Sequence, residues 1–156
     1  MHFSRFAKFA AVLASLALGI QAHAAPVRFG TYYDETAPIV TCSGPVHCEV
    51  FFSQLPSDKL LLVRKVTCQI TSQSRVVQAF LYVAGGNNGS GTIARHTQLA
   101  VPSDPIASGI FYISIDAEPR WLIGQGRFPY VSVSAVAGGS IVMDCTLVGD
   151  LVDTNP

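Results

Sequence analysis

The sequence carries little charge. Only 13% of its 156 residues are Asp, Glu, Lys or Arg, and ten basic side chains balance ten acidic ones. A chain with this balance exerts no long-range attraction on polyanions, and it lacks the basic face of a nucleic-acid-binding protein. Its apolar fraction of 49% is too high for a disordered chain and fits one packed domain. We therefore expect no nucleic-acid partner.

Long apolar runs are also missing, apart from one at the start. Residues 10–20 form a largely apolar run of 11 residues, which Arg5 and Lys8 precede and the triplet Ala22-His23-Ala24 follows. A membrane span needs about 20 apolar residues, whereas this arrangement is typical of a cleaved secretory signal. We predict a signal peptide over residues 1–24, cleaved near Ala24, and one secreted or periplasmic domain over residues 25–156 without a membrane span.

The domain has only four cysteines, Cys42, Cys48, Cys68 and Cys145, which can pair in three ways. In an oxidising compartment such thiols form disulfides. A redox pair would prefer C-x-x-C before a helix, and structural zinc would need closely spaced pairs of ligands. Neither pattern is present. We predict Cys42–Cys48 around a short connection between two strands, and Cys68–Cys145 between an early strand and the last one.

Helical periodicity is absent after residue 24. Segments of alternating apolar and polar residues are separated by turns rich in Gly, Pro and Asn, which is typical of β-strands. The expected strands are residues 27–33, 39–42, 48–52, 60–71, 75–83, 92–101, 110–115, 130–136 and 141–148. The pattern predicts an all-β domain of about eight or nine strands, an antiparallel β-sandwich or jelly-roll-like fold.

Two local features give finer predictions. Counting by twos places Leu60 and Leu62 on the apolar face of their strand, and Arg64 falls on the same face. We expect either a β-bulge that re-aims Arg64 or a buried acid that pairs with it. Between the last two strands, Gly138-Gly139 predicts a two-residue hairpin turn.

Two segments resemble a group of small exported bacterial β-sandwich proteins of unknown function. They are residues 55–70 (LPSDKLLLVRKVTCQI) and residues 142–153 (VMDCTLVGDLVD). The shared features are a Pro-x-x-Lys-x-Leu turn and strand, and a final strand that leads into Gly and a short tail. This resemblance implies a bacterial origin and a β-sandwich. The group has no assigned activity, so the resemblance implies no site residue.

Residue patterns for catalysis are scarce. Only His47 and His96 follow the leader, and neither H-E-x-x-H nor G-x-S-x-G occurs. The glycine-rich GGNNGSG segment leads into a strand pattern rather than into a phosphate-binding helix. With all four cysteines expected in disulfides, no thiol nucleophile remains. We predict a protein that is not an enzyme, with no metal and no cofactor.

One segment, residues 115–130, has the composition of a ligand site. Its candidate residues are Asp116, Glu118, Arg120, Trp121, Arg127 and Tyr130. An aromatic ring can stack on the C–H face of a sugar while carboxylate and guanidinium groups hold the hydroxyls. The simpler interpretation is that Trp121 closes one end of the sandwich and the charges solvate a loop.

Three functions remain open. The favoured hypothesis is a non-catalytic module that binds a glycan or another surface ligand. The alternative is a structural or interaction protein of the cell envelope that pairs through an edge strand. A small hydrolase, which would need two carboxyl groups across a cleft, is the least favoured.

Overall fold

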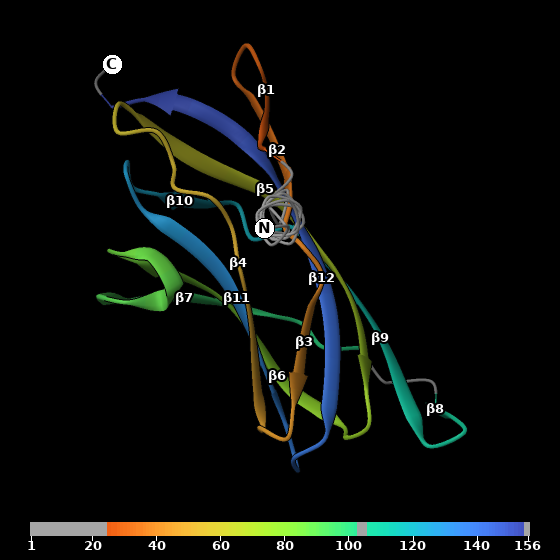
Figure 1. Cartoon of the computed structure of the whole chain (residues 1–156). Coiled ribbons are helices and arrows are strands. Elements are labelled where there is room, and N and C mark those ends of the chain that lie inside the picture. Colours follow the sequence, from red (N-terminus) through yellow and green to blue (C-terminus); the bar gives the residue numbers. More distant parts are fainter. Residues whose placement is uncertain (1–24, 103–105, 155–156) are drawn as a thin grey trace, which may run out of the picture.

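The computed structural model describes residues 25–102 and 106–154, so the predicted leader lies outside the described residues. Two antiparallel sheets face each other as a sandwich (Figure 1). Among these residues the helical structure is limited to η2 (Asn87–Gly89), a single 3-10 turn. No helix in this part of the chain has the length and hydropathy needed to cross a membrane. The predicted all-β fold is confirmed.

The larger sheet has eight strands and is built around its two longest, β5 (Lys59–Ser72) and β12 (Ser140–Asp153). The other strands extend it on either side: β2 (Tyr32–Thr36), β1 (Val27–Phe29) and β3 (Val40–Ser43) beyond β12, and β9 (Ile110–Ala117), β8 (Ile106–Ala107) and β10 (Trp121–Ile123) beyond β5. The predicted first strand, residues 27–33, is in fact split into β1 and β2 by a turn at Gly30, whose φ is 62°.

The smaller sheet has four strands in the order β4 (His47–Phe51), β11 (Phe128–Ala135), β6 (Val76–Ala84) and β7 (Thr92–Leu99). Alternation along β11 shows how it buries one face. Val131 and Val133 are fully buried in the core between the sheets, whereas Ser132 and Ser134 are half-buried on the other face. This period of two is what the sequence pattern predicted.

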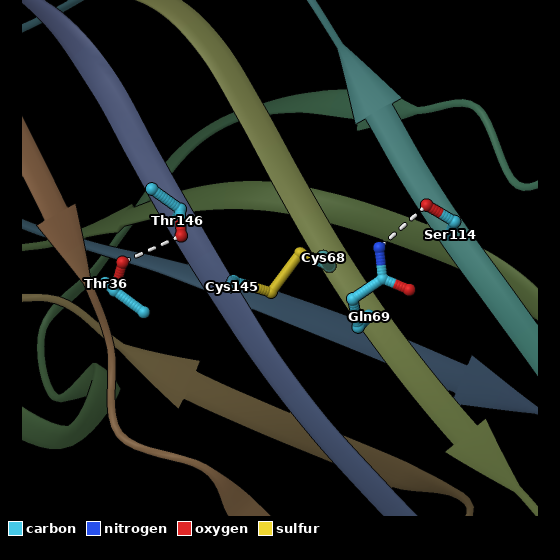
Figure 2. The surroundings of a disulfide bond; sticks show 6 residues. All are labelled: Thr36, Cys68, Gln69, Ser114, Cys145 and Thr146. Carbon is cyan, nitrogen blue, oxygen red and sulfur yellow. Dashed lines mark hydrogen bonds between the residues drawn. A yellow bond between two sulfur atoms is a disulfide. The ribbon is translucent and has the colours of Figure 1, made fainter.

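Both predicted disulfides are present, and the described residues contain no free cysteine. Cys68 of β5 lies directly opposite Cys145 of β12, with 4.1 Å between their Cα atoms, so this bond staples the two central strands of one sheet (Figure 2). Cys42 of β3 and Cys48 of β4 have Cα atoms 5.7 Å apart. Because β3 and β4 belong to different sheets, the short-range disulfide joins the two layers.

Figure 2 also shows the outer face around the Cys68–Cys145 bond. The two sulfur atoms lie in the core, where both cysteines are buried. The next residue on each strand points to the opposite face: Thr146 hydrogen-bonds the Thr36 hydroxyl at 2.9 Å, and Gln69 donates to the Ser114 hydroxyl at 2.9 Å. Polar side chains therefore link neighbouring strands on this face, while sulfur links them on the inner face.

The predicted hairpin turn at Gly138-Gly139 is wrong. The strands that flank it, β11 and β12, belong to different sheets and do not pair. Gly138 is needed for a close backbone approach instead, because a Cβ atom there would lie 2.4 Å from the Gly44 carbonyl oxygen. The Gly44 N–H donates to the Gly139 carbonyl at 3.0 Å. These glycines let the chain cross between the sheets beside the β3–β4 connection.

Arg64 lies at a β-bulge. Of the two explanations predicted for a charged residue on the apolar face of its strand, the bulge is the one that the structure shows. The register of β12 on β5 shifts between Val148 and Gly149, which leaves Arg64 as the extra residue. Its side chain is exposed, and its Nε atom lies 2.5 Å from a carboxylate oxygen of Asp150.

The prediction that Leu60 and Leu62 lie on the apolar inner face of β5 is wrong. Leu61 and Val63 are fully buried, whereas Leu60 and Leu62 lie half-buried on the outer face. The prediction failed here because one extra residue reverses the alternation on one side of the bulge.

Candidate functional site

A row of rings crosses the outer face of the smaller sheet. Phe51, Tyr130, Tyr82 and His96 occupy one register line across its four strands. Their ring centroids are separated by 5.2, 5.2 and 5.1 Å in that order. Tyr130 is only 5% exposed because its two neighbours stack on its faces. The row therefore forms one contiguous unit with Phe51 at one end and His96 at the other.

A cleft of about 820 Å³ opens at the Phe51 end of this row. One wall comes from the connection between β2 and β3 and from β3 itself, another from the end of β4 and the residues after it, and a third from η2. The lining residues are Pro38, Ile39, Val40, Thr41, Val50, Phe51, Phe52, Ser53, Gln54, Asn87, Asn88 and Phe128. We refer to it as the β4 cleft. Its volume is within the range of about 300–1,000 Å³ that is usual for small-ligand sites.

The η2 turn is held against β4 by its backbone conformation. Asn88 and Gly89 have φ values of 54° and 72°, which Asn and Gly tolerate better than other residues. A Cβ atom at Gly89 would lie 3.4 Å from the Phe51 ring, so the turn rests directly on that ring. The glycine-rich segment that the sequence identified only as a loop thus builds one wall of the cleft.

The β4 cleft is neutral. None of the twelve residues that line it has an ionisable side chain. Its polar groups are carboxamides and hydroxyls: Gln54 donates to the Gly126 carbonyl at 3.0 Å, and Asn87 accepts from the Asn88 N–H at 2.8 Å. The Asn88 side chain has no hydrogen-bond partner among the described residues. In the cleft that the Phe51 ring also lines, this carboxamide offers both a donor and an acceptor to a ligand.

A buried carboxylate hydrogen-bonds the backbone of one residue that lines the cleft. Glu35, on the inner face of β2, accepts hydrogen bonds from the Tyr33 hydroxyl at 2.5 Å and from the backbone N–H of Ser53 at 2.8 Å. Burial raises the pKa of Tyr33 well above its usual range, and the adjacent Glu35 carboxylate adds to this effect. Ser53 lines the cleft, so Glu35 positions the cleft's backbone without facing the ligand space.

Neither Glu35 nor the β4 cleft was among the features predicted from the sequence. A signal for Glu35 exists, since Tyr33, Glu35 and Ala37 alternate on one face and an acid stands on an otherwise apolar side. The cleft has no comparable signal, because its walls come from segments far apart in the chain.

The six predicted site residues are not gathered in one place. Trp121 packs against the core from the larger sheet, with the Arg95 guanidinium 5.2 Å from its ring centroid. Tyr130 belongs to the ring row on the outer face of the smaller sheet. The exposed carboxylate of Asp116 pairs with Lys65 at 3.0 Å. Arg95 also donates to the Leu122 carbonyl at 3.2 Å, so it links β7 of the smaller sheet to β10 of the larger sheet.

The remaining three predicted residues lie on the surface near these elements. Glu118, Arg120 and Arg127 are exposed. Arg120 has a φ of 46°, an uncommon value for a residue with a side chain. A role of this segment in binding stays a prediction.

One histidine makes a notable contact. His47 Nδ1 lies 2.9 Å from the Ser134 hydroxyl on the outer face of the smaller sheet. Neither residue lines the β4 cleft. Within residues 25–102 and 106–154 no group of three or more His, Cys, Asp or Glu side chains is arranged to hold a metal ion.

No family model, curated protein or solved structure matches this chain. The resemblance to small exported bacterial proteins therefore stays an expectation from two sequence segments.

Proposed function

We propose that the protein is an exported, non-catalytic module that binds an uncharged glycan in the β4 cleft. The observation that carries the proposal is that the Phe51 ring and the Asn88 carboxamide, which has no hydrogen-bond partner among the described residues, line one cleft without ionisable groups. A sugar has an apolar C–H face and hydroxyl groups that both donate and accept. Aromatic rings suit the first and carboxamides suit the second.

The disulfides support the exported part of the proposal. Two bonds, one within a sheet and one between sheets, form and persist in oxidising compartments such as the periplasm or the cell exterior. A glycan of the cell envelope is a ligand that such a protein would meet.

The test is an NMR titration of the exported, disulfide-bonded protein with neutral oligosaccharides from cell wall and exopolysaccharide. We expect amide shifts that centre on Phe51 and Asn88. Shifts centred on Arg120 and Trp121 would instead assign the ligand to the segment predicted from sequence. No binding of any neutral oligosaccharide would overturn the proposal.

Two variants test the contacts. Asn88→Gly removes the carboxamide and still accepts the positive φ, and Phe51→Leu removes the ring while keeping an apolar side chain. Each should weaken binding about tenfold, since one ligand contact of this kind is worth roughly 1.5 kcal/mol. Tyr112→Ser, at an exposed position of the larger sheet, is the matched control and should bind normally. Release of shortened sugars during the titration would contradict a non-catalytic role.

A further inference from the structure

The outer face of the larger sheet carries an apolar patch at the end where β1 lies (Figure 1). Its most exposed members are Phe29 at 84%, Val27 at 62%, Tyr32 at 43% and Leu122 at 41%. Leu60, Leu62, Val148 and Val152 lie half-buried on the same face. Exposed apolar areas of this kind mark contact surfaces in soluble proteins. None of these residues lines the β4 cleft.

The register places the centre of the patch on β12. One line across the sheet contains Phe29, Tyr32, Asp150, Leu62 and Leu122, contributed by β1, β2, β12, β5 and β10 in that order. Two apolar side chains thus stand on each side of β12. In a rotation by half a turn about β12, each pair exchanges places with the other.

On the neighbouring register line, an acidic and a basic side chain stand on opposite sides of β12. Asp34 of β2 and Lys65 of β5 flank Val148 of β12. The acid lies on the side of Phe29 and Tyr32, and the base lies on the side of Leu62. The same half-turn therefore brings an acid to a base.

We propose that this patch is the interface of a homodimer, in which two larger sheets pack face to face about a two-fold axis parallel to β12. In this arrangement Phe29 of each copy meets Leu122 of the other, Tyr32 meets Leu62, and Asp34 meets Lys65. A two-fold interface has to be complementary to itself, and the flanking apolar pairs and the Asp34–Lys65 pair meet that condition. Sheets that pack with nearly aligned strands are a common arrangement.

The charge at the centre of the patch is compatible with burial. Because β12 lies on the axis, Asp150 of one copy faces Asp150 of the other. Each already pairs with Arg64, 2.5 Å away in its own copy, so covering this line leaves no unpaired charge, which would be costly. A lipid surface fits less well, because four acids, Asp34, Asp116, Asp144 and Asp150, share this face with two bases, Arg64 and Lys65. Anionic lipids favour the opposite balance.

Sedimentation equilibrium of the exported, disulfide-bonded protein tests the proposal. We expect a monomer–dimer equilibrium between micromolar and near-millimolar concentration. Phe29→Ser should weaken dimerisation by at least about tenfold, because it removes the most exposed aromatic side chain of the patch from both copies. Tyr112→Ser, at the other end of the same sheet, should leave it unchanged. A wild-type protein that is monomeric throughout this range would overturn the proposal.

A charge exchange tests the axis itself. Asp34→Lys and Lys65→Asp should each weaken the dimer, and the double variant should restore most of the affinity, because opposite charges again face each other. Circular dichroism and thiol counting confirm that each variant is folded. Additive weakening in the double variant would exclude this axis. Flotation of a monomeric protein with phosphatidylcholine vesicles would show that the patch serves a lipid surface instead.

The dimer and the β4 cleft are separable. Phe29→Ser should leave the oligosaccharide titration unchanged, and Phe51→Leu should leave sedimentation unchanged. Failure of one proposal therefore does not affect the other.

Discussion

Glu35 of the larger sheet accepts a hydrogen bond from the backbone N–H of Ser53, 2.8 Å away, in the segment that follows β4 of the smaller sheet. The carboxylate is only 5% exposed, and its second oxygen accepts from the Tyr33 hydroxyl. A side chain of one layer thus satisfies a backbone group of the other layer, at the border of the β4 cleft.

Replacement of Glu35 should reveal this link. Glu35→Ala leaves the Ser53 N–H and the Tyr33 hydroxyl without their acceptor, so we expect the free energy of unfolding to fall by about 2–4 kcal/mol. Glu35→Gln keeps an oxygen for Ser53 and offers an N–H to the Tyr33 oxygen, so its loss should stay below about 1 kcal/mol. Urea unfolding without reductant measures both. Equal losses would show that the hydrogen bonds contribute little.

Tyr33 should make stability depend on pH in the alkaline range. Its pKa is raised in the folded state, first by burial and then by Glu35, so folding favours the protonated phenol. This contribution is complete below the ordinary pKa of about 10 and declines as the pH rises above it. Absorbance at 295 nm should show one tyrosine that ionises only as the protein unfolds, and Tyr33→Phe should remove it. The assignment fails if all five tyrosines ionise together near pH 10 in a protein that is still folded.

The two disulfides should differ in their contribution to stability. In the chain-entropy account, the Cys68–Cys145 bond, with a sequence separation of 77, contributes up to about 4.5 kcal/mol. The Cys42–Cys48 bond, with a separation of 6, contributes up to about 2.4 kcal/mol. Paired Cys→Ala variants, compared by thermal and urea unfolding, should lose stability in this order. The reverse order would mean that the link between the sheets outweighs loop length.

Gly149 should not tolerate a side chain. A Cβ atom there would lie 2.4 Å from the Leu62 carbonyl oxygen and 2.8 Å from a methyl carbon of Leu61, beside the bulge of β5. Gly149→Ala should therefore cost about 2–4 kcal/mol or prevent folding. Gly124→Ala is the control, since its new methyl group would meet nothing closer than Arg127 Cγ at 3.6 Å. Similar unfolding midpoints for the two variants would contradict the close packing at Gly149.

Export leaves a chemical record that mass spectrometry can detect. We expect the exported protein to begin at Ala25, to contain two disulfides and to react with no thiol reagent before reduction. A chain that retains residues 1–24, or that shows two or more reactive thiols, would contradict the predicted leader or the oxidising compartment.

Much of the fold could be predicted from local patterns. Alternation identified the longer strands, because a half-buried strand must place apolar side chains on every second residue. It merged β1 with β2 and missed the short strands β8 and β10, so the described residues form twelve strands rather than eight or nine. The prediction failed where a short segment is compatible with two different backbone arrangements. Gly138-Gly139 fits a hairpin turn as well as a close crossing between sheets. Only the pairing of β12 with β5 on one side and with β2 and β3 on the other excludes the hairpin.

The candidate site was less predictable than the fold. Composition drew attention to residues 115–130 because several sugar-binding residue types lie close together in sequence. In the folded protein, Trp121 packs on the core and Tyr130 stacks between two rings of another surface. The β4 cleft instead combines Ile39, Phe51 and Asn88, whose proximity depends on how the sheets pack.

Local properties of the chain, its strand period and its even number of cysteines, are enough to predict a β domain with two disulfides. Only the tertiary structure decided which sheet receives each strand, that Cys42–Cys48 joins the layers, and that Glu35 faces Ser53. These features depend on contacts between residues that are distant in the chain. Their free energies come from packing and from satisfying buried polar groups, which no short segment specifies alone.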